Sequence, residues 1–189
     1  MTTVKVCGIK NAETARTAWQ AGVHYLGLVL TKSRRQIGLD AARSIIARVP
    51  QARFVAVGHD VSAELFEAML ALPVVGVQLH GPTPAGWISR ARARGKMAIA
   101  TTLDREADVV LMDGAIPGSG KPWAWHKPDF PRPVWLAGGL TPHNVRYVVR
   151  ECKPDGVDVS SGVEADGEKQ VDLIRLFIEE VRHGDNTSA

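Results

Sequence analysis

The alternation of short apolar runs with amphipathic stretches constrains the fold of this chain most strongly. Eight runs rich in Val, Ile and Leu predict strands at about 4–8, 25–30, 54–58, 76–80, 97–102, 109–113, 134–138 and 156–160. Parallel strands need a crossover connection, usually a helix, so strands that alternate with helical stretches are typical of a parallel α/β sheet. Eight such units predict a closed, single-domain (β/α)8 barrel of the TIM type.

The stretches between the strands predict the helices and one exception. Amphipathic patterns predict helices at about 11–22, 39–49, 62–72, 84–95, 141–152 and 167–183. Thr141 and Pro142 suit the N-cap and first turn of one of them. Only residues 103–108 separate the fifth and sixth strands, too few for an ordinary crossover helix. The barrel is therefore predicted to be compact, with its fifth helix reduced or absent.

Length and composition limit the organisation of the chain. Its 189 residues suit one domain, predicted over residues 1–184, followed by a flexible tail at 185–189. Cys7 and Cys152 are the only cysteines, and their spacing indicates neither a disulfide framework nor a metal site. The first residues do not show a basic segment followed by an apolar stretch, and no run approaches the roughly 18 apolar residues of a membrane span. We therefore expect a cytoplasmic protein without a membrane partner.

The charge of the chain favours a small anionic ligand over nucleic acid. The formal net charge is +3, but the 23 basic residues are scattered among 20 acidic ones. The densest basic cluster, at residues 32–35, is too short for a nucleic-acid surface. Nucleic acid is therefore not an expected partner. Separately, the chain is expected to be a monomer or a homodimer.

Polar residues stand at the ends of several predicted strands. In a parallel barrel these ends converge on one surface, so their side chains are expected to share a site. Residues two positions apart point to the same face of a strand, which places Lys5 with Cys7 and Asp158 with Ser160. Because the first and eighth strands of a closed barrel are neighbours, we predict an ion pair between Lys5 and Asp158 inside the barrel.

Glycines and serines after the seventh and eighth strands predict a phosphate site. Barrels commonly bind phosphate at this place through backbone N–H groups. The candidates are Gly138, Gly139, Ser160, Ser161 and Gly162. A tight turn at the two consecutive glycines is the alternative reading.

Seven segments together resemble the phosphoribosylanthranilate isomerases of tryptophan biosynthesis, in the order of that family and over nearly the whole chain. They are VCGIK (6–10), KSRRQI (32–37), VQLHG (77–81), LMD (111–113), GSGKPWAW (118–125), GGLTPHNV (138–145) and VDVSSGVE (157–164). The resemblance implies a (β/α)8 barrel enzyme. It would convert N-(5-phosphoribosyl)anthranilate into 1-(2-carboxyphenylamino)-1-deoxyribulose 5-phosphate by an Amadori rearrangement, with no metal and no organic cofactor.

The resemblance also assigns roles to residues. The reaction needs an acid that protonates the ribose ring oxygen and a base that removes the proton from C2. In the family these are an aspartic acid and a cysteine, which match Asp113 and Cys7. Arg35 corresponds to the arginine that faces the anthranilate carboxylate, and His80 and Asp158 are expected to bind substrate. Taken alone, Cys7 could instead be a buried structural cysteine, and Asp113 a helix cap or turn residue. Arg35 could be a solvated surface charge, and His80 could make a structural hydrogen bond at the end of its strand.

Two places depart from the family pattern. The loop after Asp113 is short, and Pro117 stands where a glycine is usual before GSGK. The third strand ends in His59-Asp60, where the family more often has other residues. Trp123 and Trp125 are candidates for a wall beside the anthranilate ring.

Three other functions remain open at this stage. A metal-dependent sugar-phosphate epimerase could use His59, Asp60 and His80 as ligands. A phosphosugar-binding barrel without catalysis would keep the glycine loops and could lose the acid and base. A bifunctional barrel that also isomerises the related histidine-pathway aminoaldose would be expected to have an aspartate in place of Cys7.

Overall fold

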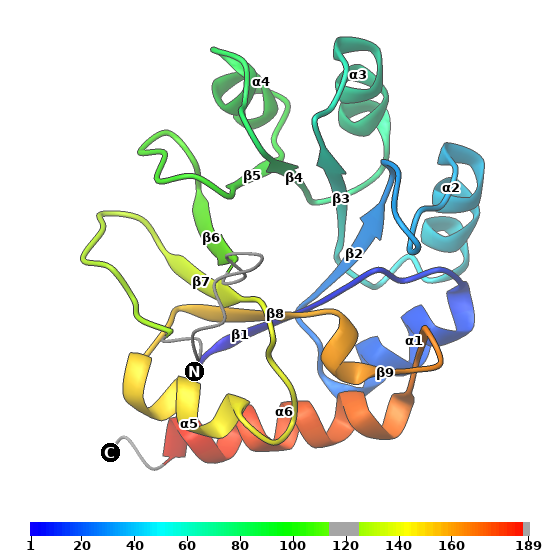
Figure 1. The fold of residues 1–189 in the computed structure, drawn as a ribbon. Coiled ribbons are helices and arrows are strands. Elements are labelled where there is room, and N and C mark those ends of the chain that lie inside the picture. Colours follow the sequence, from blue (N-terminus) through cyan, green and yellow to red (C-terminus); the bar gives the residue numbers. More distant parts are fainter. Residues whose placement is uncertain (114–124, 187–189) are drawn as a thin grey trace.

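Eight parallel strands form a closed barrel. The computed structural model describes residues 1–113 and 125–186, and its strands pair in the order of the sequence, with β8 beside β1 (Figure 1). They are β1 (Thr3–Cys7), β2 (Tyr25–Val29), β3 (Phe54–His59), β4 (Gly76–His80), β5 (Met97–Ala100), β6 (Val109–Asp113), β7 (Val134–Ala137) and β8 (Gly156–Val159). The predicted fold class is confirmed.

Helices cover the outside of the barrel. They are α1 (Ala12–Ala21), α2 (Leu39–Arg48), α3 (Ala63–Ala71), α4 (Trp87–Ala93), α5 (Val145–Cys152) and α6 (Val171–Asn186). Side-chain caps start α1, where Asn11 accepts a hydrogen bond from the Thr14 amide, and α3, where Ser62 accepts one from the Leu65 amide. No helix in the described residues combines the length and apolar character needed to cross a membrane.

The fifth helix is absent, as predicted. Residues 101–108 join β5 to β6 through turns alone, which leaves one side of the barrel without a helix (Figure 1). Asp108 stabilises this connection, because its carboxylate accepts a hydrogen bond from the Ala98 amide at 2.9 Å and pairs with Arg92 at 3.1 Å. After β6, residues 125–133 also carry no helix, whereas Pro117 and Trp123 lie outside the described residues.

α5 and α6 begin four residues later than predicted, and α4 begins at Trp87 and not at about 84. α5 begins at Val145 and not at Thr141, because Asn144 accepts a hydrogen bond from the Thr141 amide at 2.8 Å and closes a turn there. α6 begins at Val171 and not at 167, because the preceding residues form a hairpin of β9 (Glu164–Ala165) and β10 (Glu168–Lys169). Gly167, in the left-handed region at a φ of 79°, allows the turn of this hairpin.

The end of α6 corrects the predicted boundary of the tail. The helix continues through Asp185 to Asn186, two residues that the prediction placed in a flexible tail. The carboxylate of Asp185 accepts hydrogen bonds from the amide and the hydroxyl of Thr2, at 2.9 and 2.6 Å. These bonds join the two ends of the chain, so the helix does not fray at 185. Residues 187–189 lie outside the described part.

The strands separate two apolar layers. Outward residues such as Val4 and Val6 pack against the helices. The inner layer is smaller and consists of Val55, Val57, Ile99, Val109, Leu111, Trp135 and Ala137. Lys5 is fully buried in the barrel, and its ammonium group lies 2.9 Å from a carboxylate oxygen of Asp158. The ion pair predicted from strand alternation is confirmed.

Candidate active site

A cavity of about 420 Å³ opens at the carboxyl ends of the strands. Its wall contains nine of the ten residues proposed from the sequence: Cys7, Arg35, His80, Asp113, Gly138, Gly139, Asp158, Ser160 and Ser161. Gly162 does not line the cavity. A Cβ on Gly162 would lie 1.8 Å from the Leu140 carbonyl oxygen, so this glycine lets the loops after β7 and β8 pack directly on each other.

Cys7 ends β1 and presents its thiol to the cavity. Gly27, its partner on β2, has the space for this thiol, since a Cβ on Gly27 would lie 2.8 Å from Cys7 Sγ. Burial raises the pKa of the Cys7 thiol, while the positive charges of Lys5 and Lys169 act in the opposite direction. Cys7 is therefore protonated at neutral pH.

The buried ion pair lies two residues below the thiol on β1. Burial lowers the pKa of Lys5, but the charges and hydrogen bonds of Asp158 and Cys7 together outweigh this effect, so the pKa of Lys5 is raised and the amine stays charged. Lys5 occupies one oxygen of Asp158, whereas the other, Oδ1, is buried without a partner in the described residues. That free oxygen belongs to a residue of the cavity wall and can accept a hydrogen bond from a ligand.

His80 and Asp113 line the cavity from β4 and β6. Burial lowers the pKa of His80, and Lys5 lowers it further, although the charge of Asp113 acts in the opposite direction. The imidazole is therefore neutral at neutral pH and lies 2.5 Å from the side-chain amide of Gln78. Asp113 is exposed at the last position of β6 and is accessible to a ligand.

The loops after β7 and β8 leave several backbone N–H groups without a hydrogen bond in the described residues. Gly138 and Gly139 adopt left-handed φ angles of 79° and 67°, which favour glycine. The Gly138 carbonyl accepts a hydrogen bond from the Trp125 indole N–H at 3.2 Å, and the Gly139 carbonyl accepts one from the Asn144 side-chain amide at 2.9 Å. Within the described residues, the amides of the two glycines and of Ser161 make no hydrogen bond. These N–H groups are available to a phosphate group.

Arg35 contacts an acidic residue that the sequence analysis had given no role. Its guanidinium donates to both carboxylate oxygens of Glu164, at 2.6 and 2.8 Å. The hydrogen bond from Arg35 holds the pKa of Glu164 at about 2, with a further contribution from Lys169. Glu164 ends the VDVSSGVE segment, so its position was visible, but Lys169 lies outside every segment of the resemblance.

The third strand end does not assemble a metal site in the described residues. His59 Nδ1 lies 3.0 Å from Asp60, and the rings of His59 and His80 are 6.4 Å apart. Within residues 1–113 and 125–186, no group of three His, Cys, Asp or Glu side chains is arranged to hold a metal ion. The epimerase alternative thus receives no support from this geometry.

The fold and the cavity together define the class of the protein. Enzymes with this fold carry their active sites at the carboxyl ends of the strands, where this chain gathers a thiol, carboxylates, an imidazole and two glycines. It is a (β/α)8-barrel enzyme. Residues 4–180 match the model of the N-(5'-phosphoribosyl)anthranilate isomerase family, and the chain belongs to that family.

Individual relatives agree with this assignment. The isomerase of Streptococcus pneumoniae serotype 19F (strain G54) is 37% identical over 198 residues, covering 97% of this chain and 98% of the relative. That of Streptococcus gordonii is 36% identical over 195 residues, covering 97% of this chain and all (100%) of the relative. The family resemblance inferred from the sequence segments is confirmed.

Solved structures of the family superpose on the barrel. The isomerase of Thermotoga maritima has a TM-score of 0.83 at 32% identity, covering 96% of this chain and 99% of the other. A phosphoribosylanthranilate isomerase in complex with reduced 1-(o-carboxyphenylamino)-1-deoxyribulose 5-phosphate has a TM-score of 0.77 at 29% identity, with the same coverage.

Proposed function

We propose that Cys7 and Asp113 are the general base and general acid of the phosphoribosylanthranilate isomerase reaction, the aldose-ketose isomerisation of tryptophan biosynthesis to which family membership assigns this chain. The observation that carries the proposal is that both side chains line one cavity, from β1 and from β6. Asp113 donates a proton to the ribose ring oxygen as the ring opens to an iminium ion. Cys7 then removes the proton from C2, and the resulting enolamine tautomerises to the aminoketose.

The substrate itself completes the activation of Cys7. A thiol whose pKa is raised by burial is a poor base until positive charge approaches it. Lys5 and Lys169 already act in that direction. The iminium ion formed by ring opening adds a positive charge next to the carbon that loses its proton. Deprotonation of the thiol is thus favoured once the acid step has taken place.

The walls of the cavity suit the two ends of this substrate. The backbone N–H groups of Gly138, Gly139 and Ser161 bind the phosphate, and Ser160 lies next to them. Gly162 lets the two loops that carry these groups pack on each other. At the other end, the guanidinium of Arg35 binds the anthranilate carboxylate.

Two further polar groups contact the ribose. The unpartnered oxygen of Asp158 accepts a hydrogen bond from a ribose hydroxyl, since an acceptor buried in the wall of a cavity gains most when a ligand satisfies it. The neutral imidazole of His80 orients the opened sugar chain.

The setting of this enzyme follows from the same assignment. We propose that residues 1–186 form one domain, that the protein acts in the cytoplasm and that its partner is the small-molecule substrate. Either a monomer or a homodimer is consistent with the family, since the Thermotoga maritima isomerase is described as dimeric.

Turnover of freshly generated phosphoribosylanthranilate, followed by the loss of its fluorescence, tests the proposal. Cys7→Ala and Asp113→Ala are each expected to lower kcat by at least about a hundredfold. Cys152→Ala is the matched control, because this second cysteine is half-buried at the end of α5 and is absent from the cavity wall. No activity of the unmodified protein, or full activity of both variants, would contradict the assignment of base and acid.

A further inference from the structure

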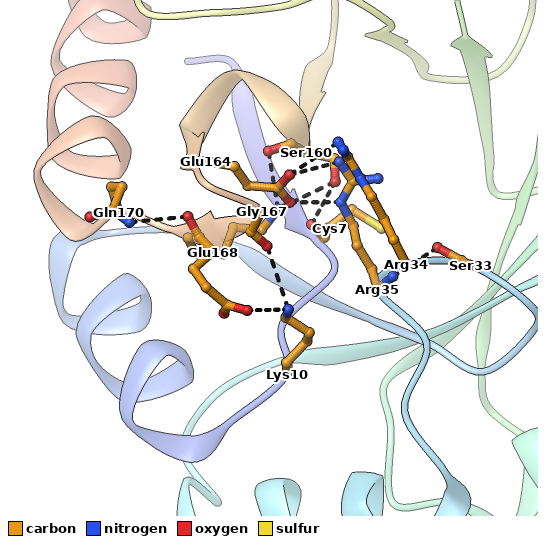
Figure 2. A network of polar contacts seen from close by, with 11 residues as sticks. Cys7, Lys10, Ser33, Arg34, Arg35, Ser160, Glu164, Gly167, Glu168 and Gln170 are labelled. Carbon is orange, nitrogen blue, oxygen red and sulfur yellow. Dashed lines mark hydrogen bonds and ion pairs between the residues drawn. The ribbon is translucent and has the colours of Figure 1, made fainter.

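A polar network crosses the mouth of the barrel and joins Arg35 to the end of β1 (Figure 2). The guanidinium of Arg35 binds Glu164. The ammonium group of Lys169 binds Glu164 at 2.5 Å and the Ser160 carbonyl at 3.0 Å. The Ser160 hydroxyl in turn donates a hydrogen bond to the Cys7 carbonyl at 3.0 Å. Arg35, Ser160 and Cys7 line the cavity, whereas Glu164 and Lys169 are buried and are not among its lining residues.

Arg35 is held at both its stem and its head. A Cβ on Gly8 would lie 2.4 Å from Arg35 Cδ, so the stem of the arginine crosses directly over this glycine, next to Cys7. The Nε and Nη2 groups bind the two oxygens of Glu164. Nη1 makes no hydrogen bond to any described residue. Glu164 therefore occupies one edge of the guanidinium and leaves another free for a second carboxylate.

Glu164 is itself fixed by a buried cation. Its side chain is 5% exposed and that of Lys169 is 3% exposed. The three N–H groups of Lys169 have three acceptors within reach, namely Glu164 Oε1, the Ser160 carbonyl and, at 3.3 Å, the Ser160 hydroxyl. Because the pKa of Glu164 is held at about 2, its charge is constant over the whole range of enzyme assays.

We propose that Glu164 is a positioning residue for Arg35, with Lys169 as the anchor that fixes Glu164 to the end of β8. Glu164 does not touch substrate. It aligns the guanidinium so that the free edge meets the anthranilate carboxylate, and this inference rests on the function proposed above. A long arginine that is fixed before the substrate arrives loses less conformational entropy on binding.

Glu164→Gln tests the proposal, because glutamine has the size of glutamate but not its charge. Arg35 would lose its bidentate acceptor and adopt several orientations. The expected result is an increase in KM for phosphoribosylanthranilate of about tenfold or more, with a smaller change in kcat, as when a binding interaction is lost without direct loss of the chemical step.

Glu168→Gln is the matched control. Glu168 lies on the same hairpin and also pairs with a lysine, Lys10, but its side chain is 59% exposed and it does not contact Arg35. The same substitution there is expected to leave KM and kcat within about twofold, as is usual for an exposed ion pair.

A second substrate separates positioning from a general structural effect. In the analogue made with aniline in place of anthranilate, the carboxylate is missing, and turnover is followed by chromatography of the ketose product. The unmodified protein is expected to prefer the full substrate, and Glu164→Gln is expected to lose about tenfold of that preference. If the variant lowers kcat/KM for both substrates equally, or behaves like Glu168→Gln, Glu164 does not position Arg35.

The outcomes keep this inference distinct from the function on which it rests. If the unmodified protein does not convert phosphoribosylanthranilate, the proposed function fails. If it does, and only Glu164→Gln is without effect, the positioning role alone fails. Should the single variant not fold, Glu164→Gln/Lys169→Met removes both charges of the buried pair and is expected to give the same loss of preference. If neither folds, the network serves stability, and the proposal is overturned.

Discussion

Lys5→Met is expected to destabilise the barrel through one buried ion pair. The ammonium group of Lys5 is fully buried and lies 2.9 Å from Asp158, whose side chain is 8% exposed. Methionine fills most of the space of the lysine stem but carries no charge. The variant therefore retains the carboxylate of Asp158 in the barrel and removes the cation that compensates it. One oxygen of this carboxylate already lacks a partner within the described chain.

The expected loss is large relative to the stability of a domain. Removing one partner of a buried pair costs about 3–5 kcal/mol, against a total of about 5–15 kcal/mol for a typical protein. With a urea dependence of about 2 kcal/mol per M, a loss of about 4 kcal/mol lowers the midpoint of unfolding by about 2 M. Urea titrations followed by circular dichroism measure this shift directly.

The loss is also expected to depend on pH. In the variant, burial raises the pKa of Asp158 and Lys5 no longer opposes this effect. A carboxyl group whose pKa is higher in the folded than in the unfolded state contributes stability that is complete below the unfolded pKa. This contribution disappears as the pH rises through the folded pKa. The deficit of Lys5→Met relative to the unmodified protein should therefore shrink as the pH is lowered from 8 towards 5.

A double variant provides the control for this experiment. Lys5→Met/Asp158→Asn removes both charges and keeps the shapes of the side chains, so it should recover much of the stability lost in the single variant. A deficit of Lys5→Met below about 1 kcal/mol at pH 7 would refute the reasoning, because that is the magnitude of an exposed pair. A deficit that grows at lower pH would refute it as well.

Two further predictions concern Cys7. Gly27→Ala should lower kcat/KM by about a hundredfold, because the new Cβ would lie 2.8 Å from Cys7 Sγ and displace the thiol. Gly38→Ala is the control and should have no effect, because its new Cβ would meet nothing within 4 Å. Equal activity of the two variants would contradict this prediction. Because burial raises the pKa of Cys7 above its ordinary 9.0, its alkylation by iodoacetamide, quantified by mass spectrometry, should still accelerate above that pH; a plateau at lower pH contradicts this.

The eight strands were predictable because each combines a short apolar run with strand alternation, and alternation also determined which side chains point inward. Lys5 and Asp158 are 153 residues apart in the chain, yet closure of the barrel was enough to predict their contact. The helix starts were predicted less well. Thr141-Pro142 has the composition of a helix start, but the side chain of Asn144 forms a turn with the same backbone. Local composition does not distinguish these two outcomes.

The supporting part of the site was not predictable. Cys7, Asp113 and the glycines stand at strand ends, where a barrel places its active site, and a family resemblance identifies them. Glu164 and Arg35 meet across 129 residues of sequence, and Lys169 reaches Glu164 from the far strand of a hairpin that has no clear strand pattern. Such contacts depend on how the loops pack after the barrel closes. The spacing of apolar residues along the chain predicts strands and helices but not the packing of loops.

The missing fifth helix also has a physical explanation that lies in the strands. The outward residues of β5 are Ala98 and Ala100, and Ala107 from the following connection is buried beside them. Alanine side chains expose little apolar surface, so a short connection without a helix can cover this side of the sheet at little cost in free energy. The catalytic candidates Cys7 and Asp113 are the last residues of β1 and β6, so neither belongs to this connection. In a barrel whose carboxyl-end loops carry the chemistry, a helix can therefore be lost where the strand beneath it is small, without removing any group that faces the substrate.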